Sequence, residues 1–130
     1  MSKNLLNSPL ERFTRMMFSR VIERLAVIMA EQELSFSQVA ALHIVDQADH
    51  ISIQDLALRL NLSLSATSRL VDDLVQRKQL DRIEDQDNRR TKLLSLTTDG
   101  REFLNQLSLE RVKIIKTAPR SFFETLGKHP

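Results

Sequence analysis

The feature that most constrains this chain is a pair of expected helices, over residues 53–60 and about 64–78, separated by only three residues. Inward-facing positions recur at i, i+3, i+4 and i+7 in residues 53–60, and the same spacing recurs in residues 67–74. The second pattern belongs to a helix expected over about 64–78. A connection this short makes two helices cross at about a right angle, as in a helix-turn-helix.

The residues around the connection fit that geometry. Ala57 supplies the small side chain needed where the second helix crosses the first. The turn needs a residue that tolerates the left-handed conformation, and Asn61 is the best choice after glycine. Ser63 can then cap the second helix. Further residues have the spacing to lock the pair together: Leu56, Leu60, Leu62, Thr67 and Leu70.

The outward face of the second helix is predicted to carry polar residues. When Thr67, Leu70, Val71 and Leu74 face inward, the opposite side presents Ser65, Ser68, Arg69 and Asp72. Serine can reach phosphates or base edges, and arginine can bind guanine through two hydrogen bonds. This face therefore suits a helix that enters the major groove of DNA. The alternatives are ordinary surface serines and an ion pair of Arg69 with Asp72 or Asp73.

A cationic hairpin is predicted to follow. Residues 80–84 and 91–97 have the composition of strands, and 85–88 form a polar turn between them. Cations near such a tip can contact the DNA backbone or the minor groove, although a solvated loop is the simpler interpretation. Combining helix and hairpin, we predict these DNA-contacting residues: Gln54, Ser63, Ser65, Ser68, Arg69, Arg89, Arg90 and Lys92.

Longer helices are expected on both sides of this segment. Capping boxes at 8–11 and 35–38 open one long helix and a second that ends near Gln47. A last helix begins at 98–100, and Pro119 ends or kinks it. The first helix is apolar on more than one side, so it needs more than one partner. We predict a dimer interface formed by these residues: Leu10, Phe13, Met17, Leu104, Leu107, Ile114 and Ile115.

Composition argues against several other functions. The formal charge is only +2, so the local placement of cations must carry the DNA-binding interpretation. The chain has no cysteine, no glycine-rich phosphate loop and no spacing typical of a serine–histidine–acid set, so we expect neither an enzyme nor a cofactor. It has no tryptophan or tyrosine, which argues against a binder of RNA or single strands.

Other candidate sites have simpler explanations. His43 and His50 are expected to be packed or surface residues, and the acidic residues of 84–87 a polar turn, so no metal site is predicted. Met16, Met17 and Met29 are expected to fill a core or a dimer interface. The N-terminus lacks an apolar segment of signal-peptide length, and residues 21–30 are too short to cross a membrane. We therefore expect a cytoplasmic protein with no membrane partner.

Several short segments, taken in order, resemble the MarR family of bacterial transcriptional regulators over roughly residues 10–118. The matching segments are 34–38 (Leu-Ser-Phe-Ser-Gln), 55–60 (Asp-Leu-Ala-Leu-Arg-Leu), 68–74 (Ser-Arg-Leu-Val-Asp-Asp-Leu), 88–90 (Asn-Arg-Arg) and 96–101 (Leu-Thr-Thr-Asp-Gly-Arg). The resemblance implies a homodimer that binds a pseudo-palindromic operator in double-stranded DNA. It also implies a repressor or activator released by a small ligand, often aromatic or phenolic.

Three features depart from the family pattern. Asn88 and Arg90 replace the usual Asp-x-Arg of the wing, which reduces an ion pair to a hydrogen bond. Residues 77–79 lack the usual glycine before the wing, so a different turn is expected there. The family's last helix is also longer than residues 120–126 allow.

The sequence thus predicts a mainly α chain with a winged helix-turn-helix over 35–98 and a two- to three-stranded antiparallel wing. Residues 8–34 and 99–126 are predicted to form a helical dimerisation region. The expected function is sequence-specific binding of duplex DNA by a regulator, more often a repressor in this family. The alternative is a winged-helix protein that acts through protein contacts, which Asn88 and the acidic pair Asp72-Asp73 would allow.

Overall fold

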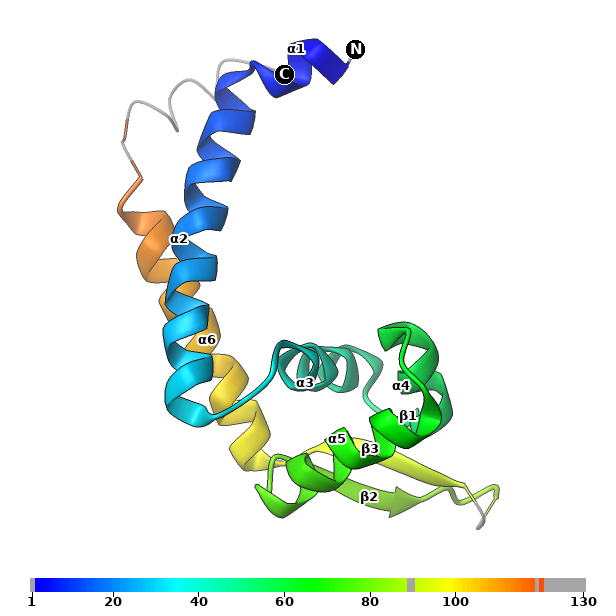
Figure 1. The fold of residues 1–130 in the computed structure, drawn as a ribbon. Coiled ribbons are helices and arrows are strands. Elements are labelled where there is room, and N and C mark those ends of the chain that lie inside the picture. The colour runs from blue at the N-terminus through cyan, green and yellow to red at the C-terminus, as the bar shows by residue number, and fades with distance from the viewer. Residues whose placement is uncertain (1, 89–90, 119, 121–130) are drawn as a thin grey trace. The chain divides into compact units, whose positions relative to one another are not determined.

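The computed structural model describes residues 2–88, 91–118 and 120. Figure 1 shows a mainly helical chain with one small sheet, which confirms the predicted fold class. The helices are α1 (Ser2–Leu6), α2 (Pro9–Gln32), α3 (Phe36–Ala48), α4 (Ile53–Leu60), α5 (Leu64–Gln76) and α6 (Thr98–Lys116), and the strands are β1 (Ile51–Ser52), β2 (Leu80–Glu84) and β3 (Lys92–Leu96). The chain divides into two compact units, which we call the winged unit (residues 32–106) and the helical unit (the described residues before 32 and after 106).

Serine caps set the starts of the helices in the winged unit. The Ser35 hydroxyl accepts the backbone N–H of Gln38 at 3.1 Å, and the Gln38 side chain accepts the backbone N–H of Ser35 at 2.9 Å. Ser52 and Ser63 cap α4 and α5 through their hydroxyl groups alone, each accepting a backbone N–H at 3.1 Å. A cap of this kind stabilises a helix by about 1 kcal/mol. The caps at Ser35 and Ser63 agree with the sequence prediction.

The sheet has three antiparallel strands in the order β1-β3-β2. Leu80 lies opposite Leu96, and Leu94 lies opposite both Arg82 in β2 and Ile51 in β1. The predicted strands 80–84 and 91–97 are confirmed, the second one residue shorter at each end. The third strand is β1, which has only two residues and therefore too little sequence to show a period-two pattern.

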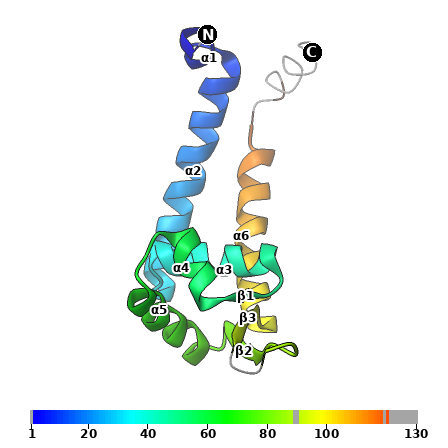
Figure 2. The same ribbon diagram turned by 90° about the vertical axis from the view of Figure 1, so that its right-hand side faces the viewer.

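One apolar core holds the winged unit together. The largest side chains without solvent contact come from α3, α4, α5 and the two long strands: Leu42, Val45, Leu56, Val71, Leu74, Leu80 and Leu94. Burying a side chain of this size contributes about 1.5–3 kcal/mol. In Figures 1 and 2, α5 and the β2–β3 hairpin lie on the same side of α3. The core thus fixes this helix and this hairpin relative to each other.

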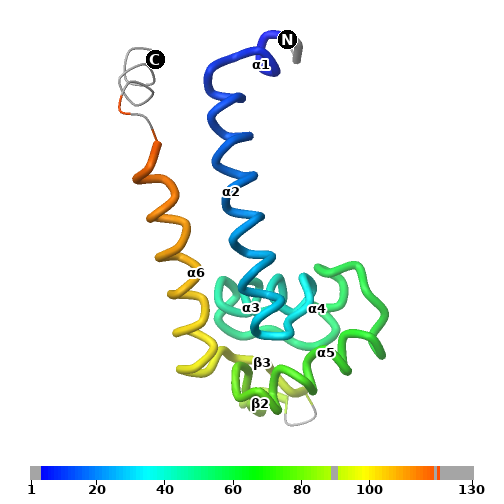
Figure 3. Tube along the Cα trace, turned by 60° about the vertical axis from the view of Figure 1, so that its left-hand side comes forward, coloured from blue at the N-terminus to red at the C-terminus, as the bar shows by residue number. Residues whose placement is uncertain are grey.

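In the helical unit, α2 and the last part of α6 run side by side in opposite directions (Figure 3). Arg24 forms an ion pair with Glu110 at 3.3 Å, and Arg20 donates to the Thr117 hydroxyl at 3.1 Å. Ser8 accepts the N–H of Glu11 at 3.1 Å at the start of α2, as predicted, whereas α1 was not predicted. Among the described helices, none is both long and apolar enough to span a membrane.

Candidate nucleic-acid interface

The helix-turn-helix forms as the sequence predicts. Asn61 ends α4 in the left-handed conformation, with φ 55° and ψ 44°. The backbone N–H of Leu62 then reaches the carbonyl of Ala57 at 3.0 Å, which satisfies a free carbonyl at the helix end. Ala57 itself is buried, in keeping with its expected place at the helix crossing.

The two faces of α5 differ as expected. Thr67, Val71 and Leu74 are buried, and the Thr67 hydroxyl donates to the Ser63 carbonyl at 2.9 Å. Leu70 is only partly buried. On the opposite side Ser65 and Arg69 are exposed and Ser68 is half-buried, while Ser63 and Ser65 place their hydroxyl oxygens 3.3 Å apart. The start of α5 therefore presents hydroxyl groups to solvent.

Arg69 does not pair with either nearby aspartate, contrary to the alternative that the sequence left open. Asp72 instead forms an ion pair with Arg82 of β2, and Asp73 pairs with Arg77 at 2.8 Å. Among the residues that the structure describes, Arg69 has no ion-pair partner. Its guanidinium group is thus available to an external anion or base.

A polar brace, formed by Gln38, Asp73 and Arg77, holds the C-terminal half of α5. The Gln38 amide donates to the Asp73 carboxylate at 2.5 Å. Arg77 donates to the same carboxylate and also to the backbone carbonyls of Gln32 at 2.6 Å and Glu33 at 2.8 Å. The hydrogen bond from Gln38, followed by that from Arg77, lowers the pKa of Asp73 below its usual value.

Sequence reasoning missed this brace. The i, i+4 spacing of Asp73 and Arg77 would have indicated the ion pair within α5. Nothing local would have indicated the carbonyls of residues 32 and 33, which are more than 40 residues away in sequence. The brace ties α5 to α3 and to the end of α2.

The turn after α5 contains a residue in the left-handed conformation, although residues 77–79 include no glycine. Lys78 has a φ of 62°, and the N–H groups of Lys78 and Gln79 bond the carbonyls of Val75 and Leu74, both at 3.0 Å. This pair of hydrogen bonds is a Schellman motif. The prediction of a different turn is therefore wrong: Lys78 takes the conformation that glycine usually takes.

Of the three cations predicted near the wing tip, Lys92 is the one that lies among the described residues. Lys92 is exposed at the start of β3, and its ammonium group lies 3.5 Å from the Glu84 carboxylate, which is also exposed. Asp85 accepts the N–H of Asp87 at 3.0 Å and organises the turn. Arg89 and Arg90 lie outside the described residues, so their contacts and the pairing of Asn88 with Arg90 stay predictions.

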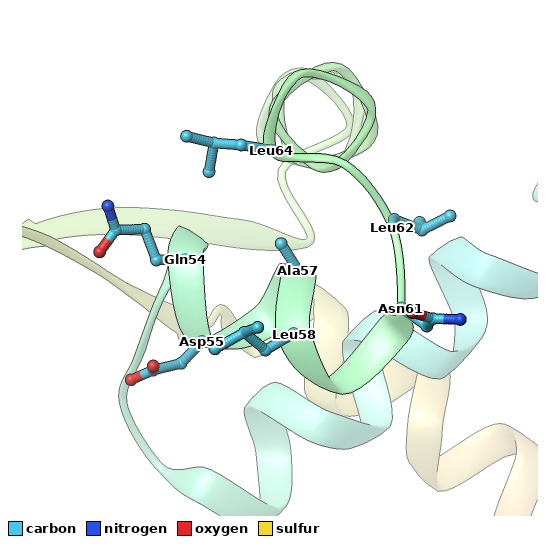
Figure 4. A pocket seen from close by; sticks show the side chains of 7 residues that line it. All are labelled: Gln54, Asp55, Ala57, Leu58, Asn61, Leu62 and Leu64. Atoms are coloured by element: carbon cyan, nitrogen blue, oxygen red, sulfur yellow. The ribbon is translucent and has the colours of Figure 1, made fainter.

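Gln54 adds a polar side chain from α4 to the surface at the start of α5. Its side chain is exposed in the first turn of that helix and lines a hollow of about 410 Å³ (Figure 4). The same hollow is lined by Leu64, the first residue of α5. Leu64 was not among the predicted contact residues, although its position between Ser63 and Ser65 could have indicated it.

The residues predicted for the dimer interface differ in how much surface they offer. Leu10 and Ile115 are 49% and 45% exposed, and Phe13 and Ile114 are partly buried. The other three are buried within the chain itself: Met17, Leu104 and Leu107. Leu104 also belongs to the winged unit. The three buried residues therefore have little surface for a second subunit, and the interface prediction is best focused on the other four.

Comparison with known proteins agrees with this arrangement. A family model described as "MarR family" matches residues 32–91. An uncharacterized HTH-type transcriptional regulator of Bacillus subtilis, YhbI, is 21% identical over 101 residues, which are 78% of this chain and 66% of that protein. The chain thus spans slightly less than two thirds of the length of that relative.

Solved structures share the fold. The RV1404 protein of Mycobacterium tuberculosis superposes with a TM-score of 0.74 at 24% identity, covering 96% of this chain and 87% of that one. A point mutant of MarR from E. coli, complexed with operator DNA, gives a TM-score of 0.62 at 22% identity and covers 95% and 91%. Residues 32–91 thus match the MarR family, and the chain, with its helix-turn-helix and three-stranded wing, shares the fold of these solved structures.

Proposed function

We propose that this protein is a transcriptional regulator that binds duplex DNA sequence-specifically as a homodimer. The observation that carries the proposal is the outward face of α5, where Ser65 and Arg69 are exposed beside a capped helix start. A helix N-terminus attracts phosphate, and arginine reads guanine in the major groove. The core holds this face on the same side of α3 as the hairpin.

The alternative is a winged-helix module that acts only through protein contacts. One of the two sequence features that favoured it, the acidic pair of α5, gives it less support in the structure. Asp72 and Asp73 were the acidic pair that allowed this alternative. Both are engaged by arginines, so their charges are partly compensated within the winged unit. Arg69, by contrast, keeps its charge for an external partner.

Homodimer formation is supported by the apolar surface of the helical unit. The described residues with large exposed apolar side chains in α2 and in 107–116 are Leu10, Phe18, Ile22, Val27, Leu109, Val112 and Ile115. An apolar surface of this extent on helices marks a site of protein contact. A second copy of the same helices would cover it and would place two α5 helices on half-sites about one helical turn of DNA apart.

Repression through operator occupancy, and release by a small aromatic or phenolic ligand, are part of the proposal but rest on family resemblance alone. The proposal assigns the chain no catalytic step and no cofactor. Cytoplasmic location stays a prediction from sequence.

The test begins with selection of duplexes from a random pool by the full-length protein, followed by salt titration of the enriched sequence. Affinity should fall steeply with salt, because binding releases counterions from phosphates. Arg69→Ala should weaken binding by about 1–3 kcal/mol. Arg111→Ala removes an equal charge from an exposed position in α6 and should leave affinity unchanged. Failure to enrich any sequence, or equal losses in the two variants, would contradict the proposal.

A further inference from the structure

The helix-turn-helix leaves leucine side chains in contact with solvent. Leu58 is 79% exposed and Leu64 is 50% exposed, whereas Leu56 and Leu74 on the same two helices are fully buried. A single exposed leucine is ordinary. Here, however, both leucines line one hollow, with Ala57 and Leu62 also in its wall (Figure 4).

The position of Leu64 distinguishes it from Leu58. Leu64 is the first residue of α5 and lies between the two serines whose hydroxyl oxygens are 3.3 Å apart. The side chains of Leu64 and Gln54 project to the same side of the helix pair in Figure 4. Leu64 is thus an apolar residue between two serines to which we assign DNA contacts, and it lines one hollow with Gln54 and Asp55.

An apolar group in such a place has one complementary feature in the major groove. Thymine presents its C5-methyl group there, and the other three bases present only hydrogen-bonding groups and C–H edges. A leucine among serines and a glutamine would gain only by covering that methyl group. Gln54, for its part, has the amide that pairs with adenine.

We propose that Leu64 determines sequence specificity by packing on the C5-methyl group of one thymine in each half-site. This inference rests on the proposed function, because it requires that α5 enters the major groove. It deepens that function by naming an A·T pair beside the bases read by Ser65 and Arg69. Leu58, one helix away from the start of α5, has no part in this contact.

The experiment compares operators that differ by a single methyl group. Each thymine of the selected duplex is replaced in turn by deoxyuridine, which lacks only the C5-methyl group. For the native protein, replacement at one position of each half-site should lower affinity about fourfold, as expected for burial of one methyl group. Other replacements should have smaller effects.

Two variants then assign the effect to a side chain. Leu64→Ala should bind the thymine operator about fourfold more weakly per half-site and should no longer distinguish deoxyuridine at that position. Leu58→Ala truncates the more exposed leucine of the same hollow and should keep the full discrimination. Both variants remove a side chain that is at least half exposed, and thermal melting checks that each remains folded.

The outcomes separate this inference from the proposed function. Specific binding without any methyl-sensitive position, or equal methyl sensitivity in Leu64→Ala, would overturn the role of Leu64 and leave the regulator intact. Loss of discrimination in Leu58→Ala alone would also overturn it, in favour of a contact through α4. Absence of any enriched DNA would overturn both.

Discussion

The winged unit and the helical unit differ in how completely they bury their apolar side chains. In the winged unit the large apolar side chains of α3, α4, α5 and the strands converge on one core that excludes solvent. In the helical unit, α2 and the last part of α6 bury Met17, Ile28 and Leu107, but Phe18 remains 67% exposed. Two neighbouring helices cannot cover all the apolar faces of both.

Under the proposed function, the two units therefore have different tasks. A unit with its own core can hold α5 and the hairpin in fixed relation before any partner binds, which a site for DNA requires. A unit with uncovered apolar faces gains its stability through association. The fold of the first should therefore depend little on protein concentration, and that of the second should depend on it strongly.

The largest expected effect comes from comparing the same change, leucine to alanine, at one position in each unit. Leu74→Ala in the winged unit should lower the free energy of unfolding by about 2–5 kcal/mol, because Leu74 is fully buried and its loss leaves a cavity. Leu109→Ala removes the same atoms from a side chain that is 61% exposed. Under conditions where the chain is monomeric, it should change the unfolding free energy by less than about 0.5 kcal/mol. Equal losses in urea denaturation would contradict the comparison.

A charge on the exposed face of α2 should act on association. We expect Phe18→Glu to weaken the proposed homodimer by about 2 kcal/mol or more, because a carboxylate would be buried without a partner. Sedimentation equilibrium measures the dissociation constant. Ser19→Glu places the same charge on the next residue, which is polar and exposed, and serves as control. A native chain that stays monomeric at micromolar concentration would remove the basis of this prediction.

A smaller effect of opposite sign is expected at the turn after α5. Lys78→Gly should raise the free energy of unfolding of the winged unit by about 1 kcal/mol, because glycine adopts a φ of 62° without the steric cost that lysine bears. Gln76→Gly, in the last turn of α5, should instead destabilise it by about as much. Chemical denaturation checks both signs, and a destabilised Lys78→Gly variant would show that the lysine side chain outweighs its backbone strain.

The same turn shows where sequence reasoning succeeds and where it fails. Caps and turns such as Ser35, Asn61 and Ser63 were predictable, because each acts within three or four residues along the chain. Lys78 was not, because its conformation follows from the packing of α5 against β2 and not from its own preference. Strand β1 exists only through its pairing with β3, more than 40 residues away.

In the candidate site, too, the features set by local sequence were predictable and those set by distant residues were not. The exposed side of α5 followed from helical periodicity, so Ser65 and Arg69 could be named in advance. The partners of Asp72 and Asp73 could not, because Arg82 comes from a strand and Gln38 from another helix. The exposure of Leu64 was not predicted, because an apolar residue in a helical pattern is normally assigned to the core.

The smallest expected effect tests the brace that joins α5 to the start of the winged unit. The lowered pKa of Asp73 means that its carboxylate stabilises the fold above the usual value of 3.8, and that this contribution is lost as the pH falls through the lowered pKa. Asp73→Asn should therefore destabilise the winged unit at pH 7 more than at pH 2–3, by under about 1 kcal/mol because the side chain is 42% exposed. Asp81→Asn, at an exposed position in β2, should show no such difference. Urea denaturation at the two pH values measures it. If the effect of Asp73→Asn were the same at both, the Gln38 and Arg77 contacts would not hold α5 through the charge of Asp73, and the rigidity of the winged unit would rest on its apolar core alone.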